Sequence, residues 1–98
     1  MNAVDDLATV FDHRVRLAIG VLLVRHGEVS FARLKQQLDL TDGNLGAHLR
    51  KLEDADSIAL RRDFVDRKPV TWYALTKAGR RTLNLHLRAL RSMIDGMD

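Results

Sequence analysis

Cysteine is absent from this 98-residue sequence, and proline occurs only once. The lack of cysteine excludes disulfide bridges, zinc sites with thiolate ligands and a cysteine nucleophile, and it is compatible with a reducing compartment. The longest uninterrupted apolar run, residues 17–24, is far shorter than the roughly 20 residues that cross a bilayer. Acidic residues at positions 5, 6 and 12 occupy the region where a signal peptide would be positively charged. We therefore expect a cytoplasmic protein.

Sequence signatures of catalysis are also lacking. There is no Gly-x-Ser-x-Gly elbow, no phosphate-binding loop and no His-Glu-x-x-His pair. The four histidines, at positions 13, 26, 48 and 86, are scattered, and no two have the i, i+4 spacing that brings two ligands to one helix turn. The sequence predicts a protein without metal or cofactor, and a binding protein rather than an enzyme.

The composition, by contrast, is that of an ordinary globular domain, with 46% hydrophobic and 30% charged residues. The length allows one domain, residues 1–98. Residues 1–60 hold seven Lys and Arg against nine Asp and Glu, whereas residues 61–98 hold nine against four. This asymmetry favours an anionic partner such as nucleic acid, although a basic solvated surface without a partner is an alternative.

The hydrophobic periodicity changes along the chain from helical to strand-like and back. Ser30, Thr41 and Thr76 are the predicted N-caps of the later helices. Pro69 favours a two-stranded ribbon with an exposed edge over a central strand, since it cannot donate a ladder hydrogen bond. The predicted elements are a helical region 4–25, formed by one long helix or two abutting ones, an extended connector 28–30, a helix-turn-helix 30–55, strands 58–65 and 70–75 joined by a charged turn, and a last helix 77–97.

The third predicted helix has an apolar face and a free face. Leu45, Leu49 and Leu52 point to one side, and small or polar residues point to the other. Small residues allow close approach to DNA, an Asn amide can read adenine, and an Arg fork can read guanine or hold phosphate. The glycines could instead merely relieve crowding. The predicted DNA-binding residues here are Thr41, Asp42, Gly43, Asn44, Gly46, Ala47, Arg50 and Lys51.

The hairpin at residues 58–75 is predicted to be a wing that holds the sugar-phosphate backbone. Its proposed contacts are Arg61, Arg62, Arg67 and Lys68. Alternatively, the charges at its tip keep an edge ribbon soluble. Trp72 and Tyr73 are interpreted as core residues at the base of the hairpin rather than as platforms for base stacking.

The last helix carries apolar residues at alternating spacings of four and three, which is typical of a helix that packs against a partner helix. Packing within the monomer alone is the alternative. The predicted interface between two copies comprises Val4, Leu7, Phe11, Leu83, Leu87, Leu90 and Ile94.

Two segments carry a resemblance to a known family. They run from Leu40 to Glu53 and from Phe64 to Arg80, and the second includes the pattern Tyr-x-Leu-Thr-x-x-Gly. From about residue 12 to residue 90 the chain resembles the small winged-helix DNA-binding regulators related to the multiple-antibiotic-resistance and arsenical-repressor families. The sequence departs from that pattern at Asp56, where Gly is usual; Asp tolerates a left-handed backbone better than most residues do.

The resemblance implies a mainly α, α+β fold: a winged helix-turn-helix with a long first helix and a C-terminal dimerisation helix. It also implies a homodimer whose first and last helices form the interface. The sequence therefore predicts a prokaryotic-type transcriptional regulator that binds double-stranded DNA. A protein-interaction module that uses Asp42 and Asp54, and a non-specific chromosome-binding protein, remain as alternatives. The presence of a small-molecule effector between the helices at the dimer interface is left open.

Overall fold

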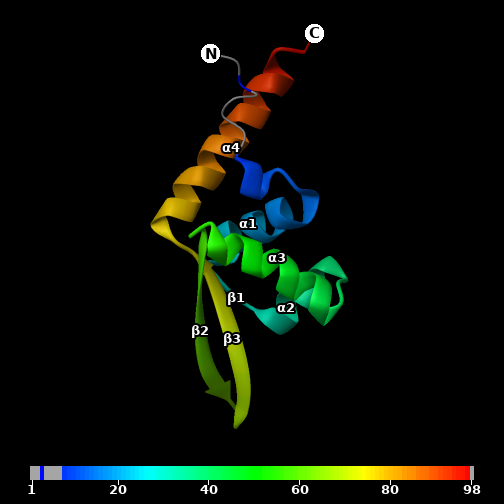
Figure 1. Cartoon of the computed structure of the whole chain (residues 1–98), viewed down its shortest axis with the longest axis vertical. Helices are drawn as coiled ribbons and strands as arrows, with labels where there is room; N and C mark the ends of the chain where they lie inside the picture. Colours follow the sequence, from blue (N-terminus) through cyan, green and yellow to red (C-terminus); the bar gives the residue numbers. More distant parts are fainter. Residues whose placement is uncertain (1–2, 4–7, 98) are drawn as a thin grey trace.

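The computed structural model describes residue 3 and residues 8–97. Three helices form a body from which a β-hairpin extends in one direction and the last helix in the other (Figure 1). The elements are a 3-10 turn Thr9–Phe11, helix α1 (Arg14–His26), strand β1 (Glu28–Ser30), helices α2 (Phe31–Leu38) and α3 (Asp42–Asp54), strands β2 (Ile58–Val65) and β3 (Lys68–Leu75), and helix α4 (Lys77–Asp95). This is the predicted winged helix-turn-helix order.

The helical region predicted at residues 4–25, as one long helix or two abutting ones, is in its described part a 3-10 turn followed by a single helix. Helix α1 begins only at Arg14, because His13 is extended (φ −153°, ψ 130°) and caps the helix by accepting a hydrogen bond from the Val15 N–H. The apolar periodicity continues through the 3-10 turn before it, since Phe11 there points into the core. Periodicity alone therefore could not reveal this break. Val4 and Leu7 lie outside the described residues.

The other helix starts are those that the sequence predicted. The hydroxyls of Ser30, Thr41 and Thr76 each accept a hydrogen bond from the backbone N–H three residues later, at 3.2, 3.1 and 2.9 Å. Each hydroxyl thereby satisfies one of the N–H groups that a helix start leaves without an intrahelical acceptor.

The sheet has the order β1-β3-β2, and all pairs are antiparallel. The strand that contains Pro69 is therefore central, contrary to the expectation of a purely two-stranded ribbon. Strand β1 pairs only with Trp72–Ala74 of β3, however. Pro69 pairs with Phe64 of β2 and therefore lies where the sheet has only two strands. There its missing N–H leaves one edge of the ribbon incomplete without interrupting the sheet.

The hairpin turn is tighter than expected. The strands end at Val65 and restart at Lys68, so only Asp66 and Arg67 form the turn, and both have positive φ (51° and 67°). Such turns match the twist of the flanking strands. The result is a compact charged tip.

The core lies between α1, α3 and the base of the sheet. Phe11 and Leu83 are completely buried in the single chain. The prediction that these two residues form the dimer interface is therefore wrong, because their surfaces are already covered within the monomer. Of the two aromatic residues predicted to be in the core, Tyr73 is buried and Trp72 is half-buried. The other members of this buried apolar cluster are Ile19, Leu23, Val29, Leu34, Leu45, Leu49, Leu52 and Ile58.

Helix α4 is fastened to the end of α3. Asp56 adopts the left-handed conformation (φ 55°), as expected for the position where the family usually carries Gly. The Thr76 hydroxyl donates to the Asp56 carbonyl at 2.6 Å, and the Thr76 N–H donates to the Ser57 carbonyl at 3.0 Å. Gly79 lies so close that a Cβ there would be 1.9 Å from the Ser57 oxygen. The start of α4 therefore has a fixed position relative to α3.

Candidate nucleic-acid interface

Helix α3 presents the predicted recognition residues on its solvent side. Its three leucines are buried, whereas Asp42, Gly43, Asn44, Ala47 and the nearby cations are exposed. Gly46 is half-buried. Arg50 and Lys51 are exposed one to two turns further along. The structure thus gathers the set on one side of a single helix.

Asp42, in the first turn of α3, is not a free acidic group. Lys35 of α2 forms an ion pair with it, with Nζ 2.9 Å from Oδ1. The pair links the two helices of the helix-turn-helix and offsets the negative charge where the helix would meet DNA. The carboxylate also lies at the helix N-terminus, where the macrodipole favours it.

The two glycines of α3 are not there to relieve crowding. Apart from its chain neighbours and the backbone of its own helix, a Cβ placed on Gly43 or Gly46 would meet no atom of the described residues within 4 Å. Glycine inside a helix costs about 0.5–1 kcal/mol relative to alanine. The monomer gains nothing from that cost in packing, so these positions are suited to close approach by an external partner.

Arg61, predicted to bind DNA, is engaged within the protein. Its guanidinium donates to both carboxylate oxygens of Glu28, at 3.1 and 2.7 Å, and to Asp63 at 2.9 Å. Hydrogen bonding to Arg61 lowers the pKa of Glu28, and the Phe64 N–H and then Arg61 lower the pKa of Asp63. Because Glu28 lies on β1 and Arg61 on β2, the side chain spans the central strand and lies 5.8 Å from the centre of the Trp72 ring. We remove Arg61 from the DNA-binding set; it braces the base of the wing.

The remaining wing cations are available. Arg62, Arg67 and Lys68 are exposed, and none of them forms an ion pair with a carboxylate of the described residues. Phe64, which the sequence analysis did not select, is 72% exposed beside them and faces Pro69 across the strands. Strand alternation places Arg62 and Phe64 on one face, a signal that could have identified this apolar tip.

A polar cluster around the buried Arg16 lies behind α3, with a half-buried His48 and an exposed His13, and it was not found from the sequence. Arg16 of α1 is buried; its Nε–H donates to the Val10 carbonyl at 2.7 Å, and its Nη1 lies 3.0 Å from Nδ1 of His48 on α3. The His13 and His48 rings are 4.6 Å apart. These residues are distant in sequence, and no spacing pattern links them.

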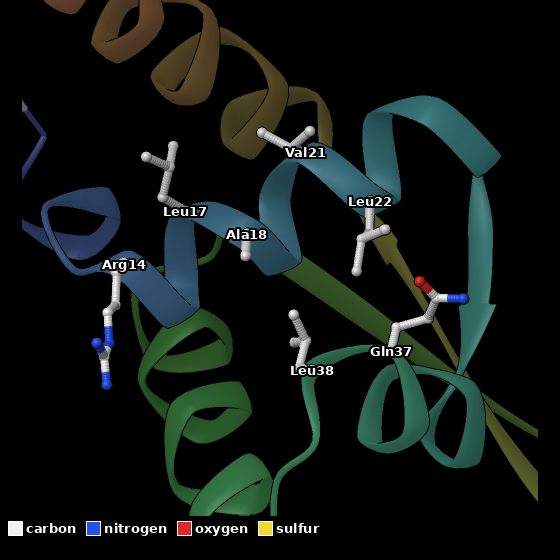
Figure 2. A pocket seen from close by; sticks show the side chains of 7 residues that line it. All are labelled: Arg14, Leu17, Ala18, Val21, Leu22, Gln37 and Leu38. Atoms are coloured by element: carbon white, nitrogen blue, oxygen red, sulfur yellow. The ribbon is translucent and has the colours of Figure 1, made fainter.

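A shallow groove of about 420 Å³ lies between α1 and the end of α2 (Figure 2). Ala18, Leu22 and Leu38 face one another across it, and Arg14 lies at the α1 end. The other lining residues are Leu17, Val21 and Gln37. The groove is thus mostly apolar with one cationic group.

Two features are absent from the part of the chain that the structure describes, residue 3 and residues 8–97. Among them, no three His, Asp or Glu side chains come together in a group that could hold a metal ion. Their helices include none that is both long enough and apolar enough to span a bilayer.

The two-helix unit α2–α3, followed by the β2–β3 hairpin, defines a winged helix-turn-helix protein. Residues 15–94 match the family described as winged helix DNA-binding domain, and the chain belongs to that family. The resemblance predicted from the sequence is thereby confirmed.

Individual relatives agree with this assignment. The chain is 35% identical over 71 residues to an uncharacterized protein of Methanocaldococcus jannaschii, a match that covers 72% of this chain and 77% of that protein. The structure of the present chain is similar to that of a transcriptional regulator homologue from Pyrococcus horikoshii. The two are 32% identical, the TM-score is 0.86, and the match covers 93% of this chain and 90% of that one. It is also similar to Bacillus subtilis PadR, solved in complex with operator DNA, with 26% identity, a TM-score of 0.60, and coverage of 68% and 42%.

Proposed function

We propose that this protein is a transcriptional regulator that binds double-stranded DNA as a homodimer. The observation that carries this proposal is the exposed, glycine-containing face of α3 beside a hairpin whose tip carries three available cations. A helix with small outward-facing residues fits the major groove, and a basic ribbon fits the adjacent backbone. The PadR structure, which has a similar fold and was solved in complex with operator DNA, supports DNA as the partner of this chain.

The proposed contacts divide into two groups. Asn44 and Arg50 read base edges, since their side chains offer amide and guanidinium groups that match adenine and guanine. Arg62, Arg67 and Lys68 hold phosphates, while Gly43 and Gly46 let the helix approach closely. Thr41 positions the start of the helix through its cap.

A selection of bound fragments from random duplex DNA, at about 150 mM salt, tests the proposal. We expect an enriched inverted repeat with half-sites about 34 Å apart, one helical turn. Binding without an enriched sequence would replace sequence-specific regulation by general chromosome coating. No binding even at low salt would reject the DNA proposal and favour the protein-interaction module.

The wing contacts make a separate prediction about salt dependence. Each phosphate contact contributes about 0.9 to the slope of log affinity against log salt concentration. We expect Lys68→Gln to reduce the magnitude of this slope by about one and to weaken binding similarly for all sequences. Arg88→Gln, an exposed cation on α4, is the matched control and should leave the slope unchanged. Equal slopes for Lys68→Gln and the unmodified protein would remove the wing from the interface.

Helix α4 supplies the proposed dimer interface. Its outer half projects from the body (Figure 1), and Ile94 is 63% exposed with Met93 and Met97 nearby. Leu87 and Leu90 are half-buried, and Leu87 packs partly against the monomer core. Exposed apolar side chains along one projecting helix fit a second copy of the same helix.

Placing a charge in this row of apolar side chains along α4, here called the seam, should separate the two copies. We expect Ile94→Glu to give a folded monomer with weakened operator binding, because a carboxylate cannot be buried there without a partner. Ser92→Glu adds the same charge on the other side of α4 and should leave the dimer intact. Sedimentation of both variants checks this; an intact Ile94→Glu dimer would reject the seam as the interface.

If a small-molecule effector exists, we propose that it binds in the groove between α1 and α2. The apolar lining with Arg14 at one end suits a small, mostly apolar molecule that carries one anionic group. A ligand there would contact α2, which positions α3 through the Lys35–Asp42 pair.

A regulator of chromosomal DNA in a prokaryotic cell acts in the cytoplasm, and we propose that location.

A further inference from the structure

The recognition helix is held from behind by a hydrogen bond that only a neutral histidine can form. Arginine is a donor at every nitrogen and is never an acceptor. Arg16 Nη1, 3.0 Å from His48 Nδ1, must therefore donate to it. His48 can accept only when Nδ1 is unprotonated and the ring proton is on Nε2.

Neighbouring groups reinforce this requirement. The centre of the His13 ring lies 4.6 Å from that of His48, with the two rings tilted by 44°, and Nδ1 of His13 accepts from the Val15 N–H at 3.1 Å. A protonated His13 would lose that helix cap and would place a second charge against His48. The groups that act on the His48 ring are His13 and Arg16 from the α1 side and Lys51 from α3. No carboxylate is among them, so nothing there would compensate an imidazolium ion.

Because Arg16 is itself held in place, its hydrogen bond to His48 depends on the position of α3. Its guanidinium is buried, and its second bond goes to the Val10 carbonyl, which fixes the side chain from the 3-10 turn side. The Arg16–His48 bond thus joins the turn before α1 to the middle of α3. His48 lies at the edge of the core face, one helical turn from Asn44 on one side and from Lys51 on the other.

We propose that His48 is a positioning residue for the recognition helix, and that its protonation releases α3 from Arg16 and weakens DNA binding. This inference rests on the proposed function. Its sign is distinctive, because added positive charge on a protein by itself strengthens binding to phosphate. Here acidification is expected to weaken it.

The effect on stability has the same direction. Burial first, and then the charge of His13, lower the pKa of His48 below its ordinary value. The folded protein therefore favours the neutral ring. This contribution to the free energy of unfolding is complete above about pH 6.5, the pKa of an unfolded-chain histidine, and is lost as the pH falls from there through the lowered folded-state pKa.

The test compares DNA affinity at about pH 8 and about pH 5.5 for the full chain, with circular dichroism to establish that it stays folded. We expect the unmodified protein to bind severalfold more weakly at the lower pH, within the limit of about tenfold that one histidine with an unshifted pKa of about 6.5 would set. His48→Gln should keep its affinity across this range, because the amide oxygen accepts from Arg16 at either pH. His26→Gln, an exposed histidine at the end of α1, is the matched control and should retain the pH dependence of the unmodified protein.

Two results would overturn the proposal: unchanged or tighter binding of the unmodified protein at low pH, or a His48→Gln profile identical to that of the unmodified protein. Failure of the proposed function is a different result, namely no DNA binding at pH 8. In that case ¹⁵N NMR of the histidine rings still tests the structural half. An unprotonated Nδ1 at His48 whose ¹⁵N shift responds to Arg16→Lys supports the hydrogen bond, and no response rejects it.

Discussion

Replacing both Gly43 and Gly46 by alanine is expected to stabilise the protein while weakening its binding to DNA. Each alanine improves helix propensity by up to about 1 kcal/mol, and open space around both positions means that the methyl groups meet nothing in the described chain. The same methyl groups would stand between α3 and the floor of the major groove. A lost base contact is worth about 1–3 kcal/mol, so we expect affinity to fall tenfold or more.

The opposite signs of the two effects make this experiment informative. Urea unfolding gives the free energy of unfolding, and fluorescence anisotropy with the selected operator gives the affinity. Ala32→Gly, at an exposed position near the start of α2, is a control for helix propensity and should lower stability by up to about 1 kcal/mol. Unchanged DNA affinity of the double alanine variant would mean that this part of α3 does not approach the groove closely.

Gly79→Ala is expected to have the largest effect on stability. The new Cβ would lie 1.9 Å from the Ser57 carbonyl oxygen, and backbone atoms cannot move aside as a flexible side chain can. The start of α4 would have to shift, breaking the Thr76 hydrogen bonds to residues 56 and 57. We expect a loss of about 3 kcal/mol or more in the free energy of unfolding, a large part of the 5–15 kcal/mol typical of a domain.

The control for this variant is Gly96→Ala at the other end of α4. There the nearest atom to an added Cβ is the Ser92 carbonyl oxygen at 3.5 Å, an ordinary contact. Gly96→Ala should change the free energy of unfolding by less than about 1 kcal/mol. A Gly79→Ala variant as stable as Gly96→Ala would show that the end of α3 and the start of α4 can separate without cost.

Local signals in the sequence predicted the local structure well. Ser30, Thr41 and Thr76 are hydroxyl residues before apolar periodic segments, and each caps a helix. Their interactions span only three residues, so neighbouring sequence contains all the information required. The exposed face of α3 could likewise be read from its leucine spacing, because a helix repeats every 3.6 residues.

The interpretation of the sequence was wrong where hydrophobic periodicity is compatible with both a core and an interface. Phe11 and Leu83 have the spacing expected of an interface, yet both are core residues, because an apolar side chain satisfies either environment equally well. The position of the break at His13 could not be predicted for a similar reason: the 3-10 turn before it keeps the same face buried. The sequence does not distinguish Arg61 from its cationic neighbours, because Glu28 lies beside it only in the folded sheet.

By itself, the sequence determined the winged helix-turn-helix order, the caps, the exposed recognition face and the charged hairpin tip, because each depends on residues within one or two turns or strands. Only the tertiary structure decided which cations are available, which apolar residues are already covered, and that Arg16 meets His48. These depend on contacts between residues 32 or more positions apart, whose energies arise only when the chain has folded.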